Sequence, residues 1–244
     1  MKLKICWLYP TIMDLYGDSG NMLVIKQRCI KRNIDVEITK VDLNEPADLS
    51  SFDLIFLGGG ADKEQTIIKD DLLSRKESIL AAIKANCFFF LVCGGYQMFG
   101  KYYIDANNNK IQGLNILDYY TEASTNHQRC IGNIAIKVNF DNTTYTLLGF
   151  ENHGGQTLGV TNPLGKVIKG FGNNVESGFE GYLDNNIFAT YMHGPLLPKN
   201  PEAADYIIKH ALMKNNPSIT LDPLDDNLSS LAKSNLYSRW SIND

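Results

Sequence analysis

The chain has 244 residues, of which 44% are hydrophobic and 20% are charged, and these proportions are ordinary for a globular protein with a sizeable core. Its net charge of −4 and the lack of a long basic run argue against nucleic acid as the main partner. No apolar segment reaches the roughly 18 residues that a membrane-spanning helix needs, and the first residues predict a strand instead of a signal peptide. We therefore expect a cytoplasmic protein without a membrane span.

The first half of the chain alternates short apolar runs with segments of helical periodicity. The apolar runs predict strands at residues 3–8, 36–41, 54–57 and 87–92. Between them, residues 21–32 and 63–84 carry apolar side chains at helical spacing. This alternation predicts an α/β fold with a mostly parallel sheet and helices on both faces.

The second half has shorter β-like runs that are broken by glycine and asparagine. They predict strands at residues 131–140, 145–150 and 187–191, some of them antiparallel. Pro201 begins a helix that extends to about Met213, and a last helix is expected near residues 227–240. We expect one domain over residues 1–216 and a C-terminal helical extension over residues 217–244.

The five cysteines are an odd number, and none lies in a C-x-x-C pair. This spacing indicates neither a zinc site nor a redox motif, so no metal is expected. A disulfide framework is rare in cytoplasmic chains of this length, and most of these cysteines should be small buried apolar side chains.

Cys93 is placed differently, because it lies where the apolar run 87–92 ends and Gly94 and Gly95 follow. Sites in doubly wound sheets form at the carboxyl ends of strands, and two glycines allow a sharp turn into a closely packed helix. The pattern is that of a nucleophile elbow with cysteine in place of serine. The helix N-terminus would favour the thiolate, and the N–H of Gly94 would point at a developing oxyanion. The alternative is a buried structural cysteine before a glycine turn.

A cysteine nucleophile needs a base, and the chain offers four histidines. His210 lies inside the C-terminal helix pattern, and His127 lies in a polar loop without a strand to fix it. His193 closes an apolar strand and precedes a Gly-Pro turn, which favours it as the base. His153, before two glycines, is the second candidate, with a loop histidine bound to backbone as its alternative role.

The segment Cys93-Gly94-Gly95-Tyr96-Gln97 fits the C-x-G-x-Q motif and resembles class I glutamine amidotransferases. The resemblance implies a flavodoxin-like fold in which cysteine attacks the side-chain amide of glutamine, with Gln97 in the substrate site. The family's catalytic histidine stands on a late strand before the C-terminal helix, as His193 does. Its first glycine-rich loop supplies an oxyanion-hole N–H, here Gly59 or Gly60 in the stretch LGGGADKEQ. From the residues alone, that stretch lacks P-loop spacing and could also be a plain tight turn.

The stretch GFENHGGQT resembles the cobyric acid synthase-like branch of these amidotransferases. Together with LYGDSGN, GGGADKEQ and MHGPLLPKNPEAADY, it resembles the GatD family, the glutamine-hydrolysing subunits of lipid II isoglutaminyl synthases, over about residues 4–213. This resemblance implies a heterodimer with a MurT-like Mur ligase subunit, which amidates the D-glutamate α-carboxylate of the lipid II stem peptide during peptidoglycan synthesis. It places no cofactor on this chain and ATP with Mg²⁺ on the partner.

Two further expectations concern single side chains. Arg129 resembles the arginine that holds glutamine in this family, and a guanidinium suits bidentate binding of an α-carboxylate. An exposed surface arginine is the alternative. Many class I members carry a glutamate two residues after the catalytic histidine, but here Pro195 stands at that position. Because Glu151, Glu180 and Asp184 lack the family spacing, a carboxylate of the partner is expected to orient His193.

Two other hypotheses about the function of the chain remain. One is a free-standing cobyric acid synthase-like amidotransferase of another pathway. The other is a non-catalytic interaction subunit, which is disfavoured because Cys93, Gln97 and His193 are all present.

Overall fold

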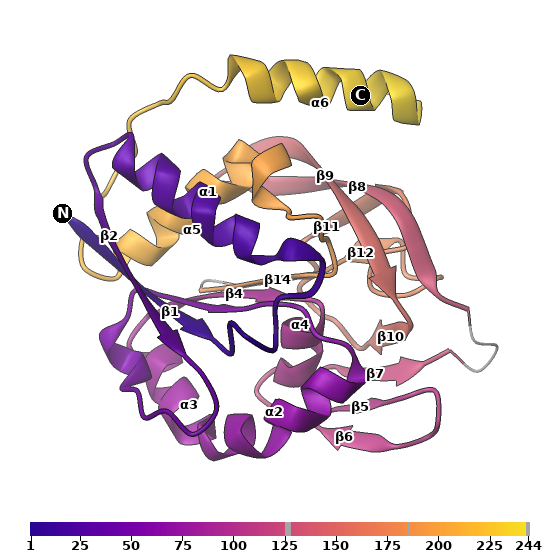
Figure 1. The fold of residues 1–244 in the computed structure, drawn as a ribbon. Coiled ribbons are helices and arrows are strands. Elements are labelled where there is room, and N and C mark those ends of the chain that lie inside the picture. The colour runs from indigo at the N-terminus through magenta and orange to yellow at the C-terminus, as the bar shows by residue number, and fades with distance from the viewer. Residues whose placement is uncertain (125–127, 185, 243–244) are drawn as a thin grey trace.

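The computed structural model of the chain describes residues 1–124, 128–184 and 186–242, which form three β-sheets (Figure 1). In the central sheet, the strands at residues 182–184 and 187–190 pair antiparallel at one edge, and all other neighbouring strands are parallel. This arrangement confirms the predicted α/β fold. The strand order is β13 (Tyr182–Asp184), β14 (Ile187–Thr190), β4 (Phe88–Val92), β3 (Leu54–Leu57), β1 (Lys2–Leu8) and β2 (Asp35–Val41).

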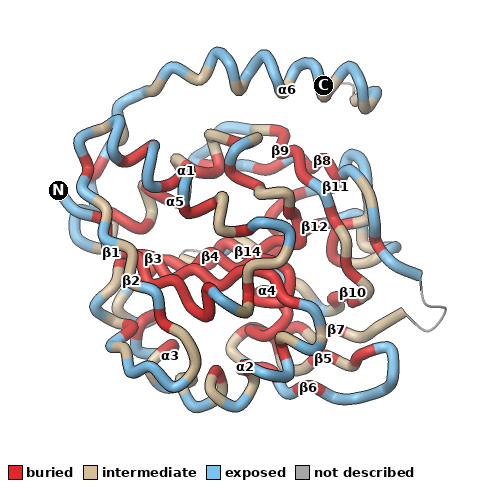
Figure 2. Tube along the Cα trace, viewed as in Figure 1, coloured by how far each residue is buried: buried red, intermediate tan, exposed pale blue. Residues whose placement is uncertain are grey.

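The centre of this sheet is buried on both faces, as continuous apolar sequence requires. Every residue of β3, β4 and β14 is buried (Figure 2). The rings of Phe56, Phe90 and Phe188 pack in a row across these three strands, with centroids 5.2 and 5.5 Å apart. This rigid centre holds the carboxyl ends of β3, β4 and β14 beside one another.

Helices cover both faces of the central sheet. Figure 1 shows α1 (Ser19–Ile30) and α5 (Pro201–Met213) on one face, and α2 (Asp62–Ser74), α3 (Lys76–Lys84) and α4 (Gly94–Phe99) on the other. The bounds of α5 are those predicted from Pro201. Short 3₁₀ turns lie at η1 (Leu15–Gly17), η2 (Leu49–Ser51) and η3 (Leu197–Lys199).

The single helical segment expected at residues 63–84 is two helices, which corrects the prediction. Arg75 separates them with φ −83° and ψ −2°, values outside a regular helix. Its guanidinium bonds Asp71 at 2.7 Å and the Tyr9 hydroxyl at 3.2 Å, so the turn is tied to the end of β1. Apolar periodicity continues through the turn, because both helices present an apolar side to the same sheet.

The second half of the chain adds two four-stranded sheets. One has the order β10 (Gly155–Leu158), β7 (Tyr120–Ala123), β5 (Tyr102–Ile104) and β6 (Lys110–Gln112). The other has the order β12 (Phe179–Glu180), β11 (Gly165–Lys169), β8 (Cys130–Phe140) and β9 (Thr143–His153). The strands predicted at 131–140 and 145–150 are confirmed as the long antiparallel hairpin of β8 and β9.

The last helix, α6 (Asn227–Trp240), forms where it was predicted and buries no residue (Figure 2). Charged contacts connect the extension to the body. Arg28 of α1 bonds Asp205 of α5 at 2.6 Å and Asp226 at 2.7 Å, and Lys233 of α6 pairs with Glu202. The extension is therefore held by ion pairs at Asp226 and Lys233 and by Ile219, which is buried in the core.

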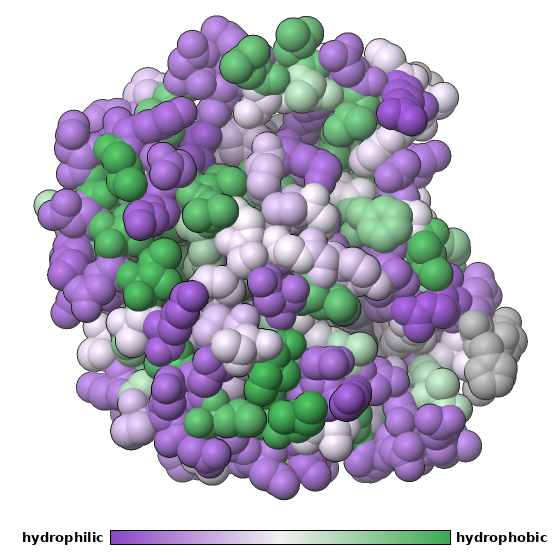
Figure 3. Space-filling view, in the orientation of Figure 1, coloured by the Kyte–Doolittle hydropathy of each residue, from purple (hydrophilic) through white to green (hydrophobic). Residues whose placement is uncertain are grey.

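The surface in Figure 3 carries hydrophobic side chains in small groups between hydrophilic ones. Within residues 1–124, 128–184 and 186–242, no helix combines the length and the apolar character that crossing a bilayer requires.

Candidate active site

Cys93 lies at a sharp turn between β4 and α4. Its backbone has φ 49° and ψ −103°, a conformation that non-glycine residues rarely adopt. The N–H of Cys93 bonds the Thr190 carbonyl of β14 at 2.8 Å. The two following glycines are needed for space, because a Cβ on Gly94 would lie 2.6 Å from the Gly60 carbonyl oxygen and one on Gly95 would lie 2.5 Å from the Leu57 carbonyl oxygen. The predicted elbow geometry is thus present, with a strained thiol-bearing residue at its tip.

His193 follows β14 and is fully buried. A two-way backbone bridge fixes it to β9, because its N–H bonds the Phe150 carbonyl at 2.7 Å and its own carbonyl accepts the Phe150 N–H at 3.3 Å. The Tyr16 ring and the imidazole pack in a T-shaped arrangement with centroids 5.1 Å apart. Its Nε2 atom is buried and makes no hydrogen bond within the described residues. This nitrogen is therefore free to take a proton.

Asp18, just before α1, supplies a carboxylate to His193 from within the chain. Its Oδ1 lies 3.2 Å from Nδ1 of His193, and both side chains are fully buried. The expectation of a partner carboxylate rested on the lack of a suitable acid in this chain, and Asp18 overturns that premise. A carboxylate on Nδ1 holds the proton there and leaves Nε2 as the basic nitrogen.

The charges around His193 stabilise its protonated form. Burial alone would lower the pKa of this imidazole, but the Cys93 thiolate and then the Asp18 carboxylate outweigh burial and raise it above 6.5. The raised pKa favours the protonated form of His193 beside the Cys93 sulfur. This electrostatic coupling joins Cys93, His193 and Asp18 in one unit.

Of the three glycines considered for oxyanion binding, Gly59 is unavailable for that role, which corrects the expectation. The N–H of Gly59 donates to Asp18 Oδ2 at 2.8 Å and so positions the carboxylate. Gly60 and Gly94 lie against each other, and neither N–H has an acceptor among the described residues. Two free N–H groups beside a thiol are suited to stabilise an oxyanion.

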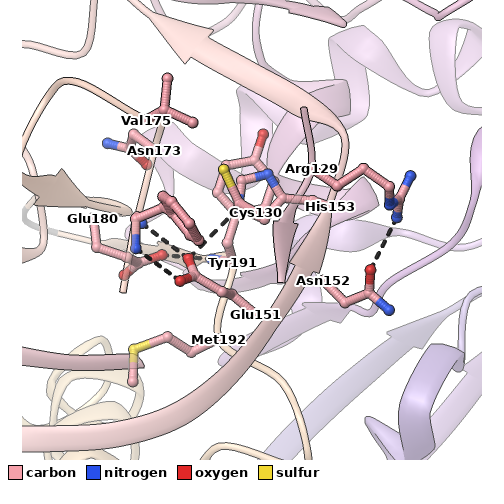
Figure 4. Close-up of polar contacts among 12 residues, drawn as sticks. Arg129, Cys130, Glu151, Asn152, His153, Asn173, Val175, Glu180, Tyr191 and Met192 are labelled. Atoms are coloured by element: carbon pink, nitrogen blue, oxygen red, sulfur yellow. Dashed lines mark hydrogen bonds and ion pairs between the residues drawn. The ribbon is translucent and has the colours of Figure 1, made fainter. Parts of the chain in front are cut away.

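The other carboxylates that were considered for His193 bind elsewhere, and Figure 4 shows two of them, Glu151 and Glu180. Glu151 accepts the N–H groups of Phe171 and Gly172 at 2.7 and 2.9 Å. Glu180 accepts the N–H of Tyr191 at 2.6 Å, and burial raises its pKa to about 8. Asp184 accepts the Tyr182 hydroxyl at 3.1 Å. Glu151 and Glu180 therefore brace the loop before β12 and the end of β14.

A cavity of about 300 Å³ opens beside Cys93. Gln97 lies in its wall, is 4% exposed, and accepts a hydrogen bond from Gln65 Nε2 at 2.8 Å. Arg129 lies at the exposed side of the same cavity. The structure thus brings Arg129 to the same pocket as Cys93 and Gln97, which belong to the turn and helix of α4.

Arg129 belongs to a hydrogen-bonded chain across the cavity mouth. Its Nη2 donates to Asn152 Oδ1 at 3.0 Å, as Figure 4 shows, and Asn152 Nδ2 donates to the Tyr16 hydroxyl at 2.6 Å. The same Tyr16 ring packs on His193. The guanidinium is therefore oriented by an amide and connected to the residues around the base.

The remaining histidines have other surroundings. His153 lines the cavity wall, stacks on Tyr191 with centroids 3.8 Å apart, and uses Nδ1 for the Gly155 carbonyl at 2.7 Å. His210 of α5 bonds the Tyr206 carbonyl, and burial lowers its pKa. His127 lies outside the described residues. No cluster of three or more metal-ligating side chains occurs in the part of the chain that the structure describes.

Comparison with known proteins agrees with this geometry. Residues 4–201 match the CobB/CobQ-like glutamine amidotransferase domain. The chain is 38% identical to the lipid II isoglutaminyl synthase (glutamine-hydrolyzing) subunit GatD of Staphylococcus aureus, over 98% of this chain and 96% of that protein. It is 40% identical to the protein of the same name from Streptococcus pneumoniae, over 93% of this chain and 88% of that one. A crystal structure of a glutamine amidotransferase superposes with a TM-score of 0.57 at 14% identity, covering 84% of this chain and 98% of that one.

These matches confirm the predicted resemblance, including its cobyric acid synthase-like branch. The chain is a glutamine-hydrolysing amidotransferase and belongs to the CobB/CobQ-like glutamine amidotransferase family.

Proposed function

We propose that this chain releases ammonia from glutamine for a MurT-like Mur ligase partner, which amidates the α-carboxylate of D-glutamate in the lipid II stem peptide. The observation that carries the proposal is near full-length identity of 38% to a subunit whose name specifies lipid II isoglutaminyl synthase. Under this proposal the partner binds ATP and Mg²⁺ and activates the carboxylate, the two chains form a heterodimer, and both act in the cytoplasm. This chain itself needs no cofactor.

The proposed chemistry begins with the thiol. His193 Nε2 takes the proton of Cys93, and Sγ attacks the side-chain amide carbon of glutamine. The N–H groups of Gly60 and Gly94 stabilise the oxyanion that forms. The C–N bond then breaks, His193 returns the proton to the leaving nitrogen, and ammonia departs. A water molecule, deprotonated by His193, cleaves the thioester to glutamate and restores the thiol.

Other side chains hold the reactants in place. Asp18 keeps the imidazole in the tautomer with its proton on Nδ1. Arg129 binds the glutamine α-carboxylate through its guanidinium, and Gln97 lines the bottom of the site near Cys93. In this scheme the partner contributes no group to the base, because Asp18 already occupies Nδ1 of His193.

The test is reconstitution of the amidation reaction. Purified chain, a Mur ligase-type partner, lipid II, ATP and glutamine should yield amidated lipid II, and omission of any one should stop it. Cys93→Ala should abolish glutamine-dependent amidation and retain amidation with ammonium chloride, because only the ammonia source is lost. Glutamine hydrolysis without amidation of lipid II under any condition would exclude the proposed acceptor and leave the glutaminase activity standing.

A further inference from the structure

The cavity beside Cys93 presents charges of both signs. Among the described residues that line it, Arg129 and Lys63 are the cations, and Asp62 at the start of α2 is the one acid. Free glutamine is a zwitterion, with an α-carboxylate and an α-ammonium group on the same carbon. If Arg129 binds the carboxylate, the ammonium group still needs an anionic or carbonyl partner in the same pocket.

Asp62 has the surroundings of a ligand-binding carboxylate. It is half-buried, and it forms no ion pair with a described residue. The pKa of Asp62 is raised, because burial and the charge of Asp105 outweigh the lowering effects of the Tyr103 hydroxyl and the Arg129 charge. Tyr103 is itself a buried residue of the cavity wall. A partly buried carboxylate without a cation is unfavourable in the empty site and is stabilised when a cation binds there.

A second explanation for Asp62 has to be separated from this one. Asp62 and Glu64 both lie in the first turn of α2, where acidic side chains stabilise a helix dipole. Only Asp62 lines the cavity. Glu64 therefore provides a control with the same charge, on the same helical turn, outside the pocket.

We propose that Asp62 binds the α-ammonium group of glutamine, so that Asp62 and Arg129 together select a free α-amino acid. This inference rests on the proposed role of the pocket in glutamine hydrolysis. Glutamine inside a peptide has amide groups in place of both charges and loses both contacts. The pair thereby restricts the thiol to free glutamine.

The test combines one substitution with substrate analogues that lack one charge each. Cys93 of the full chain is alkylated by iodoacetamide, and protection is titrated with L-glutamine or with glutaramate, which keeps the carboxylate and the amide but lacks the amine. Asp62→Asn should raise the glutamine concentration for half-protection by about 10- to 100-fold, as loss of a charge-assisted hydrogen bond does. It should leave protection by glutaramate unchanged. In the hydrolysis assay the same change should appear in KM and leave kcat nearly constant.

Matched variants separate the alternatives. In Glu64→Gln, glutamine and glutaramate should both protect Cys93 as they do in the wild type. Arg129→Ala should weaken protection by glutaramate but not by 4-aminobutanamide, which keeps the amine and lacks the carboxylate. The inference is overturned if Asp62→Asn weakens protection by glutamine and protection by glutaramate equally, or if it changes neither. If Asp62→Asn does not fold, Asp62→Ser with an unchanged melting profile takes its place. Absence of any protection by glutamine in the wild type would instead refute the proposed role of the pocket.

Discussion

His193 and His153 are both buried and lie at or just after the end of a strand, yet the regions around them differ in one decisive contact. At the end of β14, His193 has the Asp18 carboxylate on Nδ1, which leaves Nε2 for the Cys93 thiol. At the end of β9, His153 binds the backbone carbonyl of Gly155 through Nδ1. A carbonyl fixes the tautomer but adds no full negative charge, so it supports the imidazolium far less than a carboxylate does.

His153 also differs from His193 in the surroundings of its Nε2 atom and of its ring face. Nε2 of His153 lies 3.8 Å from Glu151, which already accepts two backbone N–H groups. Its ring lies flat on Tyr191, with an interplanar angle of 9°. These contacts are those of a packed wall residue. Burial and a strand end are therefore insufficient to mark a catalytic base, and the partner of Nδ1 is the distinguishing feature.

The strongest test of this contrast replaces each histidine by alanine. His193→Ala should lower glutamine hydrolysis by about 10⁴-fold, because the thiol loses its base. His153→Ala should lower kcat by no more than about 10-fold while lowering the melting temperature, since a stacked buried ring is removed. Glutamate release at saturating glutamine and a thermal melt of each variant measure the two effects. A folded but inactive His153→Ala protein would reverse the assignment.

Asp18→Asn and Glu151→Gln compare the two carboxylates. Asparagine can keep contact with His193 but favours the wrong tautomer, so kcat should fall by about 10³- to 10⁴-fold. Glu151→Gln should mainly reduce stability, because Phe171 and Gly172 would lose a charged acceptor. The rates are measured with and without the partner chain. Restoration of Asp18→Asn to the wild-type rate by the partner would show that a carboxylate across the interface takes over.

Substitutions at the cavity mouth should have intermediate effects on glutamine hydrolysis. Arg129→Ala should raise KM for glutamine by about 100-fold with an unchanged melting temperature, because an exposed guanidinium contributes little to folding. Asn152→Ala should raise KM by about fivefold, since the guanidinium stays but loses one orienting bond. Steady-state hydrolysis over a range of glutamine concentrations gives both values. A large drop in the melting temperature of Arg129→Ala would assign this side chain to folding instead.

The smallest effect concerns Glu180, which braces the residue after β14. Its pKa in the folded chain is about 8, above the ordinary 4.5, so the folded state binds the extra proton between these values. Stability from this group is therefore present at low pH and is lost as pH rises toward 8. Glu180→Gln keeps an acceptor for the Tyr191 N–H and removes the titration. The melting temperature of the wild type should fall by a few degrees relative to this variant between pH 5 and 8.5; parallel curves would contradict the assignment.

The parts of the site that sequence predicted are those that a single segment determines. A continuous buried strand followed by Cys93 and two glycines predicts a sharp turn into a helix, and the structure has this turn. The choice between Gly59 and Gly60 could not be made in this way. Three consecutive glycines look alike in the sequence. Only the hydrogen bond to Asp18 distinguishes the N–H of Gly59, which is used, from the N–H of Gly60, which is free.

Asp18 was missed because it lies 175 residues from His193 in the chain. Its signal was present in the stretch LYGDSGN, which follows the first strand, and carboxyl ends of parallel strands meet at one edge of a sheet. An acid after β1 and a histidine after β14 therefore converge, although no local spacing connects them. The two four-stranded sheets were missed as separate units for a related reason, since alternation identifies strands and not their partners.

The left-handed backbone of Cys93 has a consequence for the evolution of this protein. A side chain at φ 49° costs about 1–3 kcal/mol, and glycine at the same position avoids most of that cost. The residue that performs the chemistry is thus among the least favourable residues for the fold. Selection for heat resistance alone would favour a glycine here and yield a sturdier, inert protein. Only selection for catalysis keeps a sulfur atom at the tip of this turn.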